Sequence, residues 1–319
     1  MALEILTASD TNTYDILIIG AGPSGLTAAI YGRRANLKVG FIENEVPGGK
    51  IVNIPVITNY PGIKSISGAD LALNMYTQAT EAGAIYLYGK VTGITQKSNY
   101  HVVFLENGVN YFAKTLIIAT GTTEIKLNVP GENEYKNKGV SYCAICDGSL
   151  VKEKDVVVFG GNDIAIKDAI YLAGIANKVS VICKENALSG EPTSIETLNK
   201  SKNVNVIFNS LCKNINGDGQ SVKNVVIQNT KSNVTEEIKT SYVFVFIGSH
   251  TDAEFLSNMN DVVDKNGIIQ TDQYKQTKIK GLFAIGDITR NIYRQIATAV
   301  SDGAIAALSA VKYIKEQYK

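Results

Sequence analysis

The chain has 319 residues, of which 45% are hydrophobic and 19% are charged. This composition is typical of a globular protein with roughly two domains of about 100–200 residues each. The 31 basic and 30 acidic residues leave a net charge of +1, and nucleic acid is not expected as a partner because binding phosphates needs a basic excess. Four cysteines are too few for a secreted disulfide scaffold of this length.

Neither export nor a membrane span is expected. Residues 1–13 lack the basic and long apolar regions of a signal peptide. Asp302 breaks the alanine-rich run near the C-terminus, so the chain has no uninterrupted apolar stretch of about 18 residues. We therefore predict a cytoplasmic protein, where a C-x-x-C pair is more often catalytic or metal-binding than structural.

A strand–helix–strand unit opens the chain. Residues 15–19 predict a buried parallel strand, 24–36 a helix and 38–43 the next strand. The turn between the first two, residues 20–25, reads G-A-G-P-S-G. In such a turn the glycines permit the tight bend, the close approach of a pyrophosphate and the packing of helix on strand. Glu43 ends the second strand, placed to accept from a ribose hydroxyl. We predict a dinucleotide site here, the alternative being a glycine-rich loop without a ligand.

The same order of elements returns about 140 residues later. Residues 155–159, 163–176 and 178–183 again read as strand, helix and strand. Two further apolar strands, 116–121 and 242–248, each end in glycine and are natural crossing points between domains. The chain therefore contains two nucleotide-binding-type units and not a short-period repeat.

The predicted fold class is α/β, with two Rossmann-like, three-layer ββα domains. The first domain is discontinuous and comprises residues 1–120 and 249–319, and the second, 121–248, is inserted into it. Alternating apolar residues predict antiparallel strands at 84–114 in the first domain and at 207–243 in the second.

A second candidate binding element lies near the C-terminus. Residues 281–287 predict a strand that delivers Asp287 at a glycine turn, and a small-residue helix follows at 297–310. An aspartate and a helix N-terminus at one strand end can hold a polyol chain and the polarised edge of a ring. A simple turn followed by a packing helix is the alternative.

The chemistry is predicted to lie in the segment C-A-I-C-D-G, residues 143–148. Two thiols three positions apart can close a small, reducible disulfide. A helix N-terminus favours a thiolate, so we expect Cys143 to be the more exposed, attacking thiol and Cys146 to lie deeper and resolve. Asp147 can carry a proton to or from a thiol.

A zinc half-site is the main alternative for the two thiols. Zinc usually takes four protein ligands in a structural site, whereas Cys183 and Cys212 stand alone and the only histidines are His101 and His250. We therefore predict no metal site, and we expect Cys183 and Cys212 to be packing residues.

Taken together, these motifs resemble the low-molecular-weight thioredoxin reductase family of flavoproteins, over residues 15–313. The motifs that carry the resemblance are GAGPSG at 20–25, GGKI at 48–51, NYPG at 59–62, ATG at 119–121, CAICDG at 143–148, AIGD at 284–287 and RQIATAVSDGAIAALSA at 294–310. The resemblance implies a pyridine nucleotide-disulfide oxidoreductase fold. It further implies an FAD domain, an inserted NADPH-type domain that carries the dithiol, and usually a homodimer.

The resemblance also implies a set of cofactor-binding residues. These are Gly20, Gly22, Pro23, Ser24, Gly25, Glu43, Gly49, Lys50, Ile51, Asn59, Val91, Thr120, Gly121, Gly286, Asp287, Arg294, Gln295 and Ile296. The glycines of the first turn and Glu43 would hold the pyrophosphate and adenosine of FAD, and Val91 would contact the adenine. Asp287 would bind the ribityl chain.

The flavin itself would be lined by Lys50, Ile51 and Asn59, with Gln295 and Ile296 at its ring. Lys50 departs from the family, which usually has glutamine there; our hypothesis is that its positive charge alters the redox poise of the flavin. Among the catalytic residues, the family places Cys146 facing the flavin, Cys143 exchanging with the disulfide of thioredoxin, and Asp147 as the acid.

The second glycine turn departs from the family. Residues 160–165 read G-G-N-D-I-A, where the family has glycine at 162 and serine at 164. Asn162 puts a side chain where the backbone should approach the pyrophosphate of the nicotinamide cofactor. Residues 183–190 contain no arginine for a 2′-phosphate, and Glu185 would repel one. Each lost arginine–phosphate contact removes ~1.5–3 kcal/mol of binding, so NADPH is not expected to bind.

The sequence therefore favours a protein electron donor, as in the ferredoxin-dependent flavin thioredoxin reductases that the chain then resembles. Electrons would pass from reduced ferredoxin through FAD to Cys143 and Cys146, and from there to thioredoxin. Three other enzymes are alternatives: an NADPH enzyme with altered side chains, an NADH enzyme in which Glu185 accepts from a ribose hydroxyl, and a ferredoxin–NADP reductase, although relatives of that kind generally lack the C-x-x-C. A flavin-binding sensor with an inactive dithiol is the non-enzymatic alternative.

Overall fold

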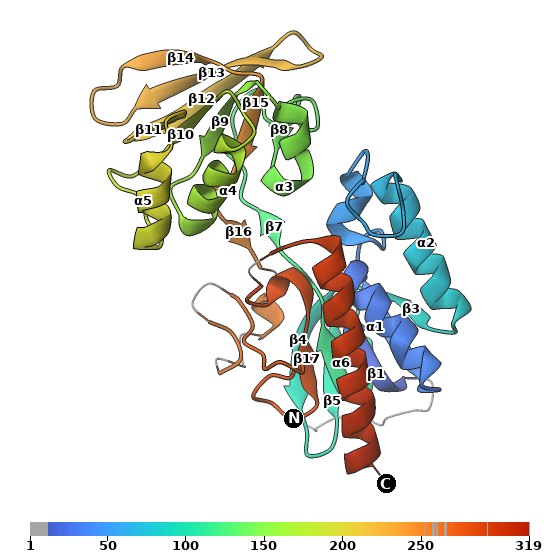
Figure 1. Cartoon of the computed structure of the whole chain (residues 1–319). Helices are drawn as coiled ribbons and strands as arrows, with labels where there is room; N and C mark the ends of the chain where they lie inside the picture. The colour runs from blue at the N-terminus through green and yellow to red at the C-terminus, as the bar shows by residue number, and fades with distance from the viewer. Residues whose placement is uncertain are drawn as a thin grey trace. The chain divides into compact units, whose positions relative to one another are not determined.

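The computed structural model describes residues 12–251, 253–256, 259, 261–264, 267–291 and 293–318. Most of the segment predicted not to be a signal peptide, residues 1–11, lies outside the described residues. The chain forms two compact units, of which unit 1 comprises Met1–Thr123 and His250–Lys319 and unit 2 comprises Glu124–Ser249 (Figure 1). The crossings fall within three residues of the predicted ones. Two short strands, β7 (Thr123–Glu124) and β16 (Ser249–His250), lie at the crossings and pair with each other.

Unit 1 is built on a seven-stranded sheet. Its strands are β1 (Thr13–Ile19), β2 (Val39–Glu43), β3 (Ile85–Tyr88), β4 (Val91–Gln96), β5 (His101–Leu105), β6 (Asn110–Ile118) and β17 (Leu282–Ala284). The order is β3-β2-β1-β6-β5-β4, and β17 also pairs with β6. β4 and β5 are antiparallel to their neighbours, but β3 pairs parallel with β2. The prediction of antiparallel strands throughout 84–114 is therefore wrong for β3.

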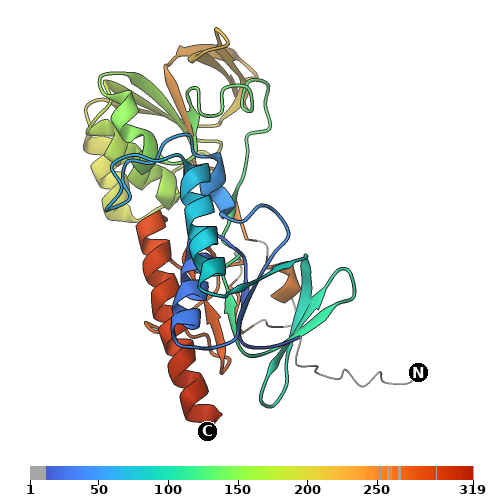
Figure 2. The same cartoon turned by 90° about the vertical axis from the view of Figure 1, so that its right-hand side faces the viewer.

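Helices cover one face of this sheet. They are α1 (Pro23–Arg34), α2 (Gly68–Glu81) and α6 (Ile296–Gln317), and three short 3₁₀ helices, η1 (Gly49–Asn53), η3 (Glu254–Leu256) and η4 (Gly286–Ile288), lie in the connections. Side chains of β1 alternate between the two faces, because successive residues of a strand point in opposite directions. Ile16 and Ile18 pack with the helices, whereas Leu17 and Ile19 pack with β4, β5 and η3. Helices α1 and α6 lie side by side in both views (Figures 1 and 2).

Unit 2 has two sheets. The parallel sheet has the order β11-β10-β9-β15-β8 and the antiparallel sheet the order β12-β13-β14. Their strands are β8 (Val140–Ser141), β9 (Asp155–Phe159), β10 (Lys178–Ile182), β11 (Val204–Ile207), β12 (Ser210–Gly217), β13 (Val222–Asn229), β14 (Thr235–Lys239) and β15 (Tyr242–Val245). The helices are α3 (Ala144–Asp147), α4 (Asp163–Ala173) and α5 (Pro192–Lys200), with a 3₁₀ turn η2 (Gly148–Val151).

The parallel sheet of unit 2 is buried on both faces. Val156 and Val158 pack among the helices, and Val157 and Phe159 pack against the antiparallel sheet. Unit 1 thus has helices on one face of a mixed, largely parallel sheet, and unit 2 has helices, a parallel sheet and a separate antiparallel sheet. This arrangement confirms the predicted α/β, Rossmann-like fold. Among the described residues, no helix is both long and apolar enough to span a membrane.

His101 makes the stability of unit 1 dependent on pH. Its side chain is buried, and this burial lowers its pKa to about 4. A histidine in the unfolded chain binds a proton below about pH 6.5, so acid stabilises the unfolded state as the pH falls from about 6.5 to about 4. Between pH 7 and pH 5 we expect His101 alone to contribute a loss of about 2 kcal/mol, and His101→Phe should remove this component. Urea unfolding at both pH values measures it; the same pH dependence in both proteins would refute the assignment.

Candidate active site

The first glycine turn leaves the N-terminus of α1 open. A Cβ at Gly25 would lie 2.1 Å from the carbonyl oxygen of Gly20, so only glycine allows α1 to pack this closely on the turn. Gly22 is the N-cap of α1 and provides no side-chain cap, and a Cβ there would meet no atom within 4 Å. Backbone N–H groups at a helix N-terminus with open space before them suit a pyrophosphate.

The carboxylate of Glu43 is held beside this turn. Its Oε2 accepts the Ala21 N–H at 3.0 Å, and its Oε1 accepts the N–H groups of Asn44 at 2.9 Å and Glu45 at 3.0 Å. The structure thus brings Glu43 to the turn, as the ribose role requires. Val91 begins β4 and packs, partly buried, on the second face of the sheet.

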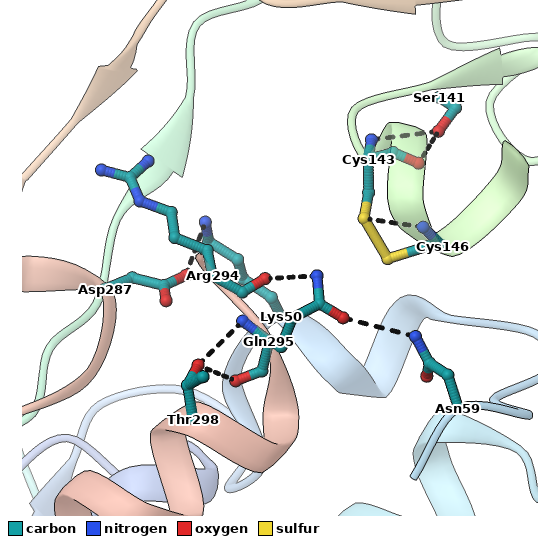
Figure 3. The surroundings of a disulfide bond; sticks show 9 residues. All are labelled: Lys50, Asn59, Ser141, Cys143, Cys146, Asp287, Arg294, Gln295 and Thr298. Carbon is teal, nitrogen blue, oxygen red and sulfur yellow. Dashed lines mark hydrogen bonds and ion pairs between the residues drawn. A yellow bond between two sulfur atoms is a disulfide. The ribbon is translucent and has the colours of Figure 1, made fainter. Parts of the chain in front are cut away.

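Lys50 joins three segments that are far apart in the sequence. From η1, its Nζ donates a hydrogen bond to Thr122 Oγ1 at 2.8 Å and lies 3.5 Å from Asp287 Oδ2 in η4 (Figure 3). Thr122 follows β6 and Asp287 follows β17, and these strands are parallel neighbours, so their carboxyl ends meet at one edge of the sheet. The ion pair fixes the carboxylate predicted to bind a ribityl chain. The effect of Lys50 on flavin poise stays a prediction.

The segment before α6 meets the N-Y-P-G segment. Asn59 Nδ2 donates to Gln295 Oε1 at 3.3 Å, and Gln295 Nε2 donates to the carbonyl of Arg294 at 2.8 Å (Figure 3). Gln295 is also the N-cap of α6, which begins at Ile296, and forms a capping box with Thr298. Our sequence analysis missed Thr298, because Q-x-x-T reverses the usual S/T-x-x-E/Q order of a capping box.

One polar atom at this edge of the sheet lacks a partner. Thr120 Oγ1 is buried without a hydrogen bond among the described residues, and the next residue, Gly121, has a φ of +71° with open space where a Cβ would lie. A buried polar group normally has a partner, which a ligand with donors and acceptors would provide. The open turn, the fixed carboxylates and this atom together fit FAD. The remaining predicted residues, Pro23, Ser24, Gly49, Ile51 and Gly286, lie in α1, η1 and η4.

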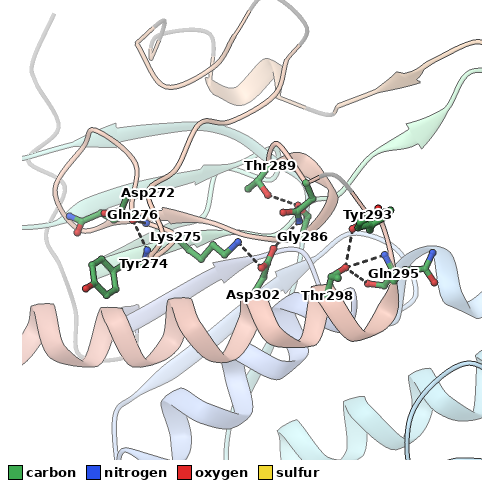
Figure 4. A network of polar contacts seen from close by, with 11 residues as sticks. Asp272, Tyr274, Lys275, Gln276, Gly286, Thr289, Tyr293, Gln295, Thr298 and Asp302 are labelled. Atoms are coloured by element: carbon green, nitrogen blue, oxygen red, sulfur yellow. Dashed lines mark hydrogen bonds and ion pairs between the residues drawn. The ribbon is translucent and has the colours of Figure 1, made fainter. Parts of the chain in front are cut away.

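Asp302 orders the loop that carries Asp287, and our sequence analysis assigned it no site role. Its Oδ2 accepts the Gly286 N–H at 3.2 Å and Asn291 Nδ2 at 2.9 Å, and its Oδ1 pairs with Lys275 Nζ at 2.6 Å (Figure 4). The two charged side chains are only 8% and 17% exposed. A charged residue within a helix of small apolar residues was the available signal, because such charges are rarely buried without a partner.

Asp302→Asn should therefore be strongly destabilising. It leaves Lys275 as a poorly compensated, mostly buried charge, for which we expect a loss of about 3 kcal/mol. Lys312→Gln is the matched control on α6, because it breaks the exposed pair with Glu316, for which a loss below about 1 kcal/mol is expected. Urea unfolding of both variants measures the difference, and equal losses would show that the buried pair does not hold this loop.

Cys143 and Cys146 are joined in a disulfide, with 5.3 Å between their Cα atoms. Cys143 is the N-cap of α3, and its Sγ accepts the Cys146 N–H at 3.2 Å. The hydroxyl of Ser141 accepts the Cys143 N–H and donates to the Cys143 carbonyl oxygen, which holds the backbone of Cys143 in place (Figure 3). Cys143 is half-buried and Cys146 is exposed. The expected order of exposure is therefore wrong, because the N-cap position draws Cys143 toward the buried Ser141 and Ala144.

Two carboxylates lie on the helices around the disulfide. Asp147 ends α3 and is half-buried. The pKa of Tyr242 is raised mainly by the burial of Tyr242 itself and, second, by the negative charge of Asp147. Asp168, which our sequence analysis missed, lies on α4, and α4 packs against α3. Burial raises the pKa of its carboxyl to about 6, and no sequence pattern marks it.

The other two thiols, of Cys183 and Cys212, are buried and form no disulfide. Burial raises the pKa of Cys212 to about 12 and also raises that of Cys183, so both stay protonated at neutral pH. In the part of the chain that the structure describes, no three His, Cys, Asp or Glu side chains group as metal ligands would.

The second glycine turn is arranged differently from the first. Asn162 is the N-cap of α4, and its Oδ1 accepts the Ala165 N–H at 2.9 Å. Its Nδ2 donates to the carbonyl of Phe246 at 2.8 Å. The side chain of Asn162 therefore takes up a backbone N–H group at the N-terminus of α4, where the first turn leaves such groups open.

The chain is similar to known proteins over nearly its whole length. The sequence profile of the family described as pyridine nucleotide-disulphide oxidoreductase matches residues 14–303. The chain is 39% identical to the thioredoxin reductase of Mycoplasma pneumoniae, covering 94% of this chain and 95% of that one. It is 38% identical to the thioredoxin reductase of Bacillus subtilis, covering 97% of each.

Two solved structures agree in fold. The thioredoxin reductase of Streptococcus pyogenes MGAS5005 superposes with a TM-score of 0.89 at 40% identity, over 96% of this chain and 99% of that one. That of Giardia duodenalis superposes with a TM-score of 0.91 at 32% identity, over 95% and 99%. The chain therefore belongs to the thioredoxin reductase family of pyridine nucleotide-disulphide oxidoreductases. The predicted resemblance to that family is confirmed, whereas nothing in these relatives supports its ferredoxin-dependent branch.

Proposed function

We propose that the chain is an FAD-dependent disulfide oxidoreductase that reduces thioredoxin through Cys143 and Cys146. The observation that carries the proposal is the disulfide, whose Cys146 is exposed, in a chain whose relatives are thioredoxin reductases. FAD, when bound, supplies the electron pair that reduces the disulfide. The open N-terminus of α1, Glu43 and the Lys50–Asp287 pair would hold it.

Exposure assigns different roles to the two thiols. Thiol–disulfide exchange requires access to the attacking sulfur, so we assign the first attack on thioredoxin to Cys146. A Cys146–thioredoxin disulfide forms, and one thioredoxin thiolate leaves and takes a proton. Cys143, whose sulfur accepts the Cys146 N–H in the disulfide, then attacks Cys146, restores the intramolecular disulfide and releases the second thioredoxin thiol. These roles replace the predicted ones, in which Cys143 attacked.

The proposed electron donor is a nicotinamide dinucleotide bound at an atypical site. The family profile that matches residues 14–303 spans both glycine turns, and the description of that family names a pyridine nucleotide. This supports the NAD(P)H alternative better than the ferredoxin donor that our sequence analysis favoured. Glu185, exposed just after β10, disfavours a 2′-phosphate, so we expect NADH to be used at least as well as NADPH.

A single assay with three donors tests the proposal. The purified, FAD-loaded protein is mixed anaerobically with thioredoxin and with NADH, NADPH or pre-reduced ferredoxin, and new thioredoxin thiols are counted. We expect turnover with a nicotinamide nucleotide. Turnover with ferredoxin alone would instead favour the protein donor, and none with any donor would favour the sensor alternative. A homodimer and a cytoplasmic location stay predictions, of which sedimentation and cell fractionation are the respective tests.

A further inference from the structure

Helices α1 and α4 begin with the same backbone geometry but with different caps. Gly22 has φ −72° and ψ 179°, and Asn162 has φ −84° and ψ 174°. The two residues hold equivalent places in the two glycine turns. In front of Gly22 the space is open, whereas the side chain of Asn162 bonds its own helix and the carbonyl of Phe246.

The amide of Asn162 uses groups that a bound anion would need. Ala165 N–H is one of the N-terminal donors of α4 that have no partner within the helix, and it is already satisfied by Asn162 Oδ1. A phosphate can bind there only if the amide swings away, which gives up this cap and frees the Phe246 carbonyl. The bonds that a nucleotide would gain are therefore offset by bonds that the protein loses.

The charged side chains near the start of α4 do not offset this loss of hydrogen bonds. Lys167, one turn into α4, is paired with Asp163 at 2.8 Å and with Glu191 at 3.2 Å. Glu185 and its exposed neighbour Lys184 follow β10. These three carboxylates outnumber the two lysines, so no net positive charge is available to draw a pyrophosphate past the amide.

We infer that Asn162 is an intramolecular competitor for the pyrophosphate subsite of unit 2, and that it sets the affinity for the dinucleotide donor. The inference rests on the proposed donor and deepens it. Replacing Asn162 by glycine removes the competing amide, and glycine is itself an acceptable N-cap, so the helix is retained. We expect Asn162→Gly to bind NAD⁺ and NADP⁺ at least about tenfold more tightly, which corresponds to about 1.4 kcal/mol.

Asn162→Asp is the matched control. It keeps the capping acceptor and the backbone conformation but adds a negative charge, so it should bind both nucleotides no more tightly than the wild-type protein. The reciprocal variant, Gly22→Asn, installs the same cap at α1. A Cβ fits there without contact, so we expect the fold to persist and FAD to bind at least about tenfold more weakly.

The experiment is calorimetric titration of the oxidised, FAD-loaded proteins with NAD⁺ and NADP⁺, together with steady-state kinetics. Tighter binding in Asn162→Gly, with a lower KM for the nucleotide and little change in kcat, supports the inference. The same dissociation constant in wild type and Asn162→Gly, or binding in neither, overturns it. The donor proposal is judged separately, by whether the wild-type protein reduces thioredoxin at saturating NADH or NADPH. Failure of one is thus distinguishable from failure of the other.

Discussion

Replacement of either Cys143 or Cys146 by serine is expected to reduce thioredoxin turnover at least about a thousandfold, because removing a covalent participant abolishes its route. FAD should stay bound, since the residues proposed to hold it lie in unit 1. Cys212→Ala is the matched control: this buried thiol stays protonated, and its loss should leave turnover within about twofold. Turnover is measured as thiol release from thioredoxin, and activity in either serine variant would contradict the dithiol assignment.

The two serine variants also separate the roles of the thiols. Cys143→Ser retains the exposed Cys146 and should trap a mixed disulfide with a thioredoxin that lacks its own resolving cysteine. Cys146→Ser retains only the half-buried Cys143 and should trap much less. Mass spectrometry of the adducts gives the answer, and preferential trapping by Cys146→Ser would restore Cys143 as the attacking thiol.

Two alanine substitutions in the first glycine turn should separate the stability of the fold from the affinity for FAD. Gly25→Ala places a Cβ 2.1 Å from the Gly20 carbonyl oxygen, so α1 must move away from the turn. We expect a loss of more than about 3 kcal/mol of stability, with or without FAD. Gly22→Ala places a Cβ in open space. Apo-protein stability should fall by no more than about 1 kcal/mol, since alanine is a poorer N-cap than glycine.

FAD affinity distinguishes the two variants further. Because the backbone at Gly22 is expected to face the pyrophosphate, Gly22→Ala should weaken FAD binding by roughly ten- to a hundredfold. Thermal unfolding of the apo-proteins and titration with FAD make the comparison. Unchanged FAD affinity in Gly22→Ala would place the pyrophosphate elsewhere, and a stable Gly25→Ala would contradict the close packing of α1.

The parts of the fold that the sequence predicted are those with a local signal. The strand–glycine–helix order at Gly20 and again at Gly160 needs no knowledge of the rest of the chain, because apolar runs and glycine turns are read within about 30 residues. Helix α2 was not anticipated, although Ser67 caps it by accepting the Asp70 N–H. Leu71, Ala72, Met75 and Ala79 are also buried at helical spacing along α2, so both local signals were present and our sequence analysis did not use them.

Features that depend on distant partners could not be predicted. The direction of β3 depends on its pairing with β2, which no residue of β3 encodes. The order of exposure of Cys143 and Cys146 depends on how Ser141 holds the start of α3. The role of Asp302 depends on Lys275, which lies on a separate loop. In each case the deciding interaction joins residues whose proximity only the folded chain creates.

The most direct test of the central claim, that a flavin and the Cys143–Cys146 disulfide act in series, is an anaerobic reductive titration of the FAD-loaded protein. We predict an uptake of about four electrons per chain, two for the flavin and two for the disulfide. Two new thiols should appear, and added oxidised thioredoxin should reverse the thiol signal. The Cys143→Ser, Cys146→Ser double variant should take up about two electrons. An uptake of only about two electrons by the wild-type protein, with no new thiols, would contradict the account.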